Sequence, residues 1–109
     1  MSERQVKLNN LLRDVVAKIL EEELDIPGTP LVTVMGAEIS PTMEHARIKI
    51  SVLPTNREAD VLAELKRRIY ELQQIVNKTL HMHPVPKIRF EIDETEAKAA
   101  RIEKLLENQ

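Results

Sequence analysis

Hydrophobic residues recur every three or four positions between Arg4 and Leu24, which is the spacing of one face of an amphipathic helix. This face consists of Leu8, Leu11, Leu12, Val15, Val16 and Ile19. Pro27 and Gly28 follow, and proline neither donates an amide hydrogen bond nor favours helical geometry in the residue before it. The pattern therefore predicts a long first helix followed by a loop, DIPGTP.

The middle of the chain alternates instead of repeating at helical spacing. Residues 31–39, LVTVMGAEI, are rich in β-branched side chains and carry no helical stripe, which predicts a strand. In residues 46–52 apolar and polar positions alternate: Ala46, Ile48, Ile50 and Val52 against Arg47, Lys49 and Ser51. This pattern predicts a half-buried strand with a basic outer face, ended by Pro54. The short SPTMEH connection favours an antiparallel hairpin.

A second long helix is predicted from Arg57 to about Leu80, and Pro84 must stop it. Its apolar stripe comprises Leu62, Leu65, Ile69, Leu72, Val76 and Leu80. The alternating segment KIRFEI, Lys87 to Ile92, predicts a third strand. Thr95 can then N-cap a short final helix that contains Ile102, Leu105 and Leu106.

The predicted order is α-β-β-α-β-α. Each helix has one apolar stripe and each strand one apolar side, so we expect an α+β domain with helices on one face of a three-stranded sheet. The other sheet face would stay open. The sheet would be mixed if the crossover through the second helix makes the third strand parallel to a neighbour, and the pattern does not predict the strand order.

The chain has 109 residues, enough for a single domain over residues 1–109. Tyr70 and Phe90 are its only aromatic residues, so the core should be aliphatic. The absence of cysteine excludes disulfides, cysteine-bound zinc and a thiol nucleophile, and suits a reducing compartment. With no secretory signal and no apolar run of membrane-spanning length, we expect a soluble, cytoplasmic protein with no membrane contact. We expect a monomer, although no pattern in the sequence determines the oligomeric state.

Sixteen basic and eighteen acidic residues give a net charge of -2, so only a local patch could bind nucleic acid. At about 100 degrees per residue, four side chains of the second predicted helix fall within about 60 degrees of one another. This polar rail consists of Arg67, Gln74, Lys78 and His81. Its composition suits phosphate and sugar contacts. Alternatively, Glu64 and Glu71 could pair with its cations along the helix.

Two further sets of cations are candidates. Arg47 and Lys49 could join Lys87 and Arg89 across the open sheet face if their strands are neighbours, although such charges could instead only block edge pairing. On the first helix Lys18 is expected to pair with Asp14, four residues before it. Neither set by itself identifies a ligand.

His81 and His83 stand two residues apart beside Pro84, and a metal site is one interpretation. A catalytic zinc site usually has three protein ligands, and only His45 and distant carboxylates could complete this one. On a helix the two histidines would diverge by about 200 degrees, which favours exposed polar residues at a helix exit. No nucleophile elbow, Walker loop, HExxH motif or glycine-rich loop is present, so we expect neither an enzyme nor a cofactor.

Three long segments of the chain contain specific residue patterns: LNNLLRDVVAKILEEELDIP, VTVMGAEISPTMEHARIKISVL and VPKIRFEIDETEAKAARIEKLL. The most specific part is the pattern V-T-V, E-I-S-P and H-A-x-I-x-I-x-V, followed by P-x-I-x-F-x-x-D from Pro86 to Asp93. In this order the segments resemble the first helix, the hairpin, and the last strand and helix of the ribosome-binding factor A family.

The resemblance implies a type II KH-like fold and a non-enzymatic assembly factor for the small (30S) ribosomal subunit. It also implies a role in late maturation of 16S rRNA near its 5' end, with RNA contact around a kinked second helix and the adjoining sheet. In the family an Ala-x-Gly kink replaces the GxxG loop of other KH domains. Arg68, Ile69 and Tyr70 occupy those positions here, so the resemblance leaves the kink open.

The leading hypothesis is binding of the immature small subunit through the rail and His83, with the four strand cations as neighbours. The expected RNA-binding set is Arg67, Gln74, Lys78, His81, His83, Arg47, Lys49, Lys87 and Arg89. One alternative is a protein-binding adaptor that uses the open sheet face or the acidic EIDETE turn. Another is a metal-dependent hydrolase at His45, His81 and His83.

Overall fold

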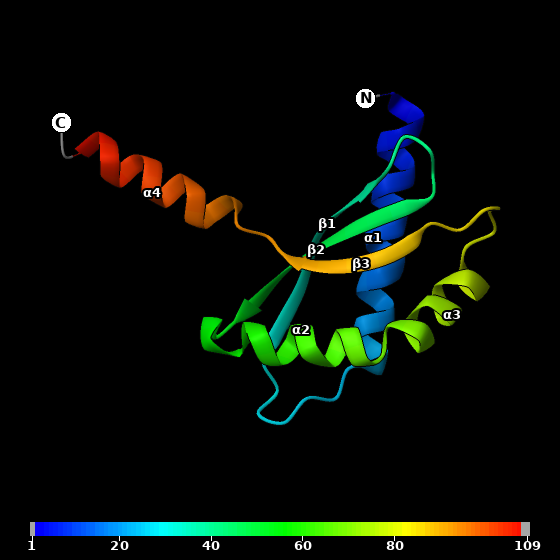
Figure 1. Ribbon diagram of the computed structural model, residues 1–109, viewed down its shortest axis with the longest axis horizontal. Helices are drawn as coiled ribbons and strands as arrows, with labels where there is room; N and C mark the ends of the chain where they lie inside the picture. The colour runs from blue at the N-terminus through cyan, green and yellow to red at the C-terminus, as the bar shows by residue number, and fades with distance from the viewer. Residues whose placement is uncertain (1, 108–109) are drawn as a thin grey trace.

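The computed structural model describes residues 2–107, and within them the predicted order is confirmed (Figure 1). Ser2 accepts a hydrogen bond from the Gln5 amide at 3.2 Å and so caps the first helix. The elements are α1 (Glu3–Glu23), β1 (Leu31–Ile39), β2 (His45–Leu53), a 3-10 turn η1 (Thr55–Arg57), α2 (Glu58–Arg67), α3 (Ile69–Thr79), β3 (Lys87–Ile92) and α4 (Thr95–Glu107). The predicted second helix is therefore present as two helices.

The three strands form one mixed sheet in the order β1-β2-β3. β1 pairs antiparallel with β2, as the hairpin prediction requires, and β2 pairs parallel with β3. The central place of β2 puts the outer faces of β2 and β3 side by side. The strands that carry the four cations Arg47, Lys49, Lys87 and Arg89 are therefore neighbours, which was the condition for these cations to share one surface.

A bulge at Met35 keeps β1 aligned with the core. Val34 pairs with Ile50 and Gly36 pairs with Lys49, so Met35 is an extra residue without a partner. Before the bulge Val32 and Val34 pack against the core, and after it Ala37 and Ile39 are buried. The extra residue reverses the alternation, which explains why residues 31–39 carry no simple period of two.

The apolar sides of the sheet, α1, α2 and α3 meet in one aliphatic core, which confirms the two-layer prediction for these elements. Its most completely buried residues are Leu12, Val16, Ile48, Ile50, Val52, Val61, Leu65, Leu72 and Val76. Two details of the predicted stripes were wrong: Leu11 is 50% exposed, and the fully buried Val61 was not assigned to a stripe.

The helix α4 does not join this layer. It extends away from the sheet at the end of the chain (Figure 1), and none of its residues is buried. Ile102, Leu105 and Leu106 are 58 to 67% exposed, so the expectation that every helix packs its stripe on the sheet is wrong for α4. Thr95 is its first residue, and the Asp93 carboxylate accepts from both the amide and the hydroxyl of Thr95 at the preceding turn.

Side-chain amides cover main-chain groups at both edges of the sheet. On β1 the Ile39 amide donates to Asn9 Oδ1 at 3.0 Å, and Gln5 Nε2 donates to the Ile39 carbonyl at 3.0 Å. On β3 the Ile88 amide donates to Gln73 Oε1 at 2.9 Å, and Gln73 Nε2 donates to the Pro86 carbonyl at 3.1 Å. The side-chain amides thus form hydrogen bonds with main-chain groups that a neighbouring strand would otherwise bond, and they attach α1 and α3 to the sheet.

Candidate nucleic-acid interface

The helical segment that carries the predicted polar rail is interrupted at Arg68. This residue ends α2 and precedes α3 with φ -98° and ψ 11°, outside ordinary helical geometry. Arg67 consequently belongs to α2, whereas Gln74 and Lys78 belong to α3 and His81 lies beyond the end of α3. The prediction of one continuous helix was wrong, and the break separates Arg67 from the other three residues of the rail.

The Arg68 side chain joins three elements at the break. Its Nη1 donates to the Glu23 main-chain oxygen at the end of α1, and its Nη2 lies 3.2 Å from Glu23 Oε1. Its Nε and Nη2 also donate to the two carboxylate oxygens of Glu71, at 3.1 and 2.8 Å. The hydrogen bond with Arg68 holds the pKa of Glu71 below its ordinary value. The hydrophobic periodicity did not single out Arg68, although the resemblance placed it at the position of the family's kink.

The cations beyond the break differ from Arg67 in their surroundings. Arg67 is bound back on its own helix by Glu64, and this hydrogen bond lowers the pKa of Glu64. Lys78 is exposed in the last turn of α3, where a cation is favourable at the helix dipole, and it forms no ion pair with another residue between 2 and 107. The helix-pair alternative therefore applies to Arg67 and not to Lys78.

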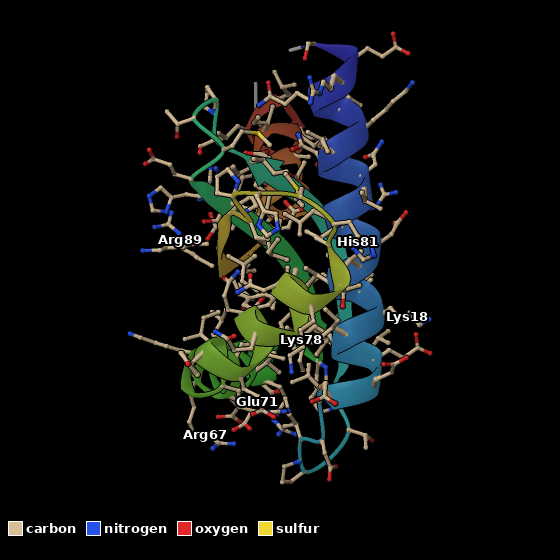
Figure 2. The ribbon with its side chains drawn as sticks, turned by 90° about the vertical axis from the view of Figure 1, so that its right-hand side faces the viewer. Lys18, Arg67, Glu71, Lys78, His81 and Arg89 are labelled. Atoms are coloured by element: carbon tan, nitrogen blue, oxygen red, sulfur yellow. The ribbon has the colours of Figure 1, made fainter. Side chains whose placement is uncertain are left out.

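His81 and His83 are placed in the segment that leads from α3 to β3, and His81 is exposed there. Figure 2 shows Lys78 between Arg67 and His81 along the α2–α3 side of the molecule. Gln74 belongs to the same helix as Lys78. The structure thus places Gln74, Lys78, His81 and His83 on α3 and its exit.

A shallow hollow of about 380 Å³ runs between α1 and α3, and its lining includes Lys18, Ile75 and Thr79. The expected pair of Lys18 with Asp14 is wrong, because Asp14 accepts from the neighbouring Arg13 at 3.0 Å. Within the described range Lys18 has no ion-pair partner. It therefore adds a second available cation to the side of the molecule that carries Lys78 (Figure 2).

On the open sheet face, three strand cations are held by two carboxylates. Arg47 donates to Glu91 at 3.0 and 2.6 Å and to Glu38 at 3.4 Å. Lys49 lies 3.0 Å from the other Glu38 oxygen, and Arg89 lies 3.7 Å from Glu91. The hydrogen bond from Arg47 is the main cause that lowers the pKa of Glu91 and raises that of Arg47. These cations are neighbours as predicted, but they are largely neutralised.

The alternating pattern of the strands already places two acidic residues on the same face as the cations. Glu38 and Glu91 occupy the same outward positions of their strands as the cations, yet only the strand order brings them within reach of Arg47. Lys87, paired in register with His45 at the end of the sheet, has no carboxylate partner among residues 2–107. Both line a hollow of about 460 Å³ together with Arg47 and Arg89.

The geometry does not favour the metal-site hypothesis. Across residues 2–107 no group of three histidine, cysteine, aspartate or glutamate side chains is placed to hold a metal ion. His45, His81 and His83 accordingly form no common ligand set. None of the helices between residues 2 and 107 combines the length and the apolar composition that a membrane span requires.

The sheet order and the packed helices define a small KH-like α+β domain with the exposed cation Lys78 in the last turn of α3. The family model of Ribosome-binding factor A matches residues 4–106, and the chain belongs to this family. A Ribosome-binding factor A from Methylobacterium radiotolerans is 34% identical, over 99% of this chain and 78% of that protein.

A crystal structure and a fitted homology model of a relative show the same fold. The crystal structure of ribosome-binding factor A from Thermus thermophilus aligns with a TM-score of 0.72 at 19% identity, over 81% of this chain and 93% of that chain. A homology model of the Thermus thermophilus protein, fitted into the cryo-EM map of a 30S-RbfA complex, aligns with a TM-score of 0.68 at 19% identity. That alignment covers 78% of this chain and 90% of the other.

Proposed function

We propose that this protein binds the free small ribosomal subunit in the cytoplasm and assists late maturation of its 16S rRNA near the 5' end. Membership of the Ribosome-binding factor A family supports the assignment, as does the relative fitted into a 30S complex. The observation that carries it is the exposed cation Lys78 at the end of α3, close in sequence to His81 and His83 and without a carboxylate partner among the described residues. Such groups suit phosphate contacts.

The candidate RNA-binding residues divide into two groups: those without a carboxylate partner in the described part of the chain and those already paired with a carboxylate. Lys78, Lys87 and the histidines can meet a phosphate directly. Arg47, Lys49, Arg67 and Arg89 must exchange a carboxylate for a phosphate, so their net gain is smaller. We therefore assign primary contacts to Lys78, His81, His83 and Lys87, with Gln74 adding hydrogen bonds and the four paired cations contributing secondarily.

The proposed role is binding rather than catalysis. A positively charged surface recognises the RNA backbone by its charge and shape, and no step of that recognition needs a cofactor or a nucleophile. The protein would act by stabilising one arrangement of the immature RNA.

Cosedimentation with purified free small subunits, at several salt concentrations, tests the proposal. We expect binding at low salt that weakens as salt rises, because each phosphate contact releases counterions. Charge reversal of the two rail cations, Arg67→Glu with Lys78→Glu, should weaken binding. It should also reduce the slope of log affinity against log salt concentration by the equivalent of up to about two phosphate contacts. Arg101→Glu with Lys104→Glu is the matched control, since it makes the same two charge reversals on the exposed surface of α4.

Absence of binding at low salt would contradict the proposal. Binding that survives RNase treatment of the subunit and ignores the double reversal would indicate the adaptor alternative instead. The maturation step is tested separately in cells that lack the gene: 16S rRNA with an unprocessed 5' end should accumulate, and the double-reversal variant should restore processing less than the control variant does.

A further inference from the structure

The break between α2 and α3 has no cause in the local sequence. Sharp helix kinks usually occur at proline, at glycine or serine, or where a side chain inserts into the ladder of helical hydrogen bonds. Here the break falls in KRRIYEL, and neither glycine nor proline occurs between Pro54 and Pro84. Helix-forming residues thus surround a non-helical residue, which means that a tertiary contact sustains the break.

Arg68 itself supplies that contact. Its side chain is only 15% exposed, and its guanidinium group spans from Glu23 at the end of α1 to Glu71 in the first turn of α3. The bond to the Glu23 main-chain oxygen matters most for geometry, because that carbonyl belongs to the last turn of α1 and is fixed by the fold. The planar guanidinium can satisfy both partners at once, which a lysine ammonium cannot do in the same geometry.

We propose that Arg68 is a positioning residue that sets the angle between α2 and α3, by linking the break to the end of α1. The link acts at a position where the local sequence has neither glycine nor proline to allow a break. It directs α3, and with it Lys78, relative to α2 and the sheet. Its consequence for binding rests on the proposed function, whereas its consequence for helix geometry does not.

Arg67 provides an internal comparison. It is the adjacent arginine with the same charge, but it is 70% exposed in its side chain and pairs only with Glu64 on α2 among the residues described. A general loss of positive charge or of a helix-surface ion pair would affect both positions alike. Of the two arginines, Arg68 alone joins separate elements, so its replacement and not that of Arg67 should change the angle.

The absence of cysteine makes a direct distance measurement possible. Spin labels at Ala59→Cys on α2 and Lys78→Cys on α3, both exposed positions, report the angle through their distance distribution in pulsed electron resonance. Arg68→Ala should broaden or shift the distribution while Arg67→Ala leaves it unchanged. Arg68→Lys, which keeps the charge and one hydrogen bond, should restore it in part.

Cosedimentation then connects the angle with binding. In chains without spin labels, Arg68→Ala should weaken small-subunit binding by about two- to thirtyfold, the usual range for a change that acts through geometry. Arg68→Lys should recover part of this loss. If the unaltered protein does not bind, the proposed function fails while the distance measurement still decides the role of Arg68.

An unchanged distance distribution in Arg68→Ala would overturn the inference. Should that variant not fold, Glu71→Gln provides a milder test, because it removes the charged acceptor on α3 and leaves the Arg68 charge in place. A shifted or broadened distribution in Glu71→Gln or in Arg68→Lys supports the link. Distributions in both variants that match the unaltered protein refute it.

Discussion

Glu91 shows how one carboxylate on the open sheet face makes neighbouring cations less available to bind RNA. It accepts two hydrogen bonds from Arg47 and lies near Arg89, which reduces the net positive charge of the outer face of the sheet. At the residue scale, a cation that the sequence identifies as available is available only if no acid lies across the strand. Lys78 meets this condition and Arg47 does not.

Removal of the Arg47 charge should raise the pKa of Glu91 toward its ordinary value. Arg47→Gln removes the main cause of the depression, while Arg89 and Lys49 keep a smaller part of it. Carboxyl-carbon NMR of Glu91 over acidic pH measures the change. Arg13→Gln is the control, because Arg13 pairs with Asp14 on α1. An unchanged titration in Arg47→Gln would contradict the assigned cause.

The sign of the linked stability effect follows from the direction of this shift. Because the pKa of Glu91 is lower in the folded protein, its contribution is fully present above the ordinary carboxyl pKa and is lost as pH falls through the folded value. Glu64 and Glu71 shift in the same direction and act in the same acidic window. Stability should therefore decrease on acidification, and less so in Arg47→Gln, as urea unfolding at a series of acidic pH values would measure.

At the scale of elements, side-chain hydrogen bonds at the edges of the sheet attach the helices to the strands. Each edge has a helix beside it whose side-chain amide bonds the strand, Asn9 for β1 and Gln73 for β3. Gln73 bonds the Ile88 amide and the Pro86 carbonyl, so α3 is fixed at the strand as well as at Arg68. The helix α3 is thus held by two attachments, one to β3 and one to α1.

Asn9→Ala should destabilise the fold by about 1 to 3 kcal/mol, because it leaves the Ile39 amide of β1 without the Asn9 acceptor in a buried place. Urea unfolding measures the difference. Asn10→Ala is a matched control: the same residue type is exposed one position later on the same helix. Equal effects of the two changes would show that helix propensity, and not the edge bond, explains the loss.

At the scale of the whole molecule, α4 stands apart from the packed part of the chain. The core is built from α1, α2, α3 and the sheet, and α4 contributes no buried residue to it (Figure 1). A helix without tertiary packing is stabilised mainly by its own propensity and its ends. The folding of the remaining domain should consequently not depend on α4.

A chain that ends after Glu94 should unfold in urea with a free energy within about 0.5 kcal/mol of that of the full chain, since among residues 2–107 the deletion removes only exposed residues and the exposed hydrogen bonds from Thr95 to Asp93. Its circular dichroism should decrease only by the helical signal of α4. A loss of more than about 1 kcal/mol, beyond the usual effect of surface changes, would mean that α4 packs on the domain in solution.

The periodicity of the sequence was sufficient for most elements of this fold. Spacing at three and four residues located α1 and the span of α2 and α3, and alternation located β2 and β3, because burial of one side is a local property of each element. The bulge at Met35 escaped prediction because its reversal of the pattern appears only against the register of β2.

The candidate site was predictable in composition but not in arrangement. The sequence determined which residues are charged and that the apolar stripes would form one aliphatic core, and its segments indicated the family. Only the tertiary structure decided the strand order that sets Glu91 beside Arg47 and the contact of Arg68 with α1 that accompanies the helix break. The physical reason is that both contacts join residues at least 44 positions apart, where no local period carries information.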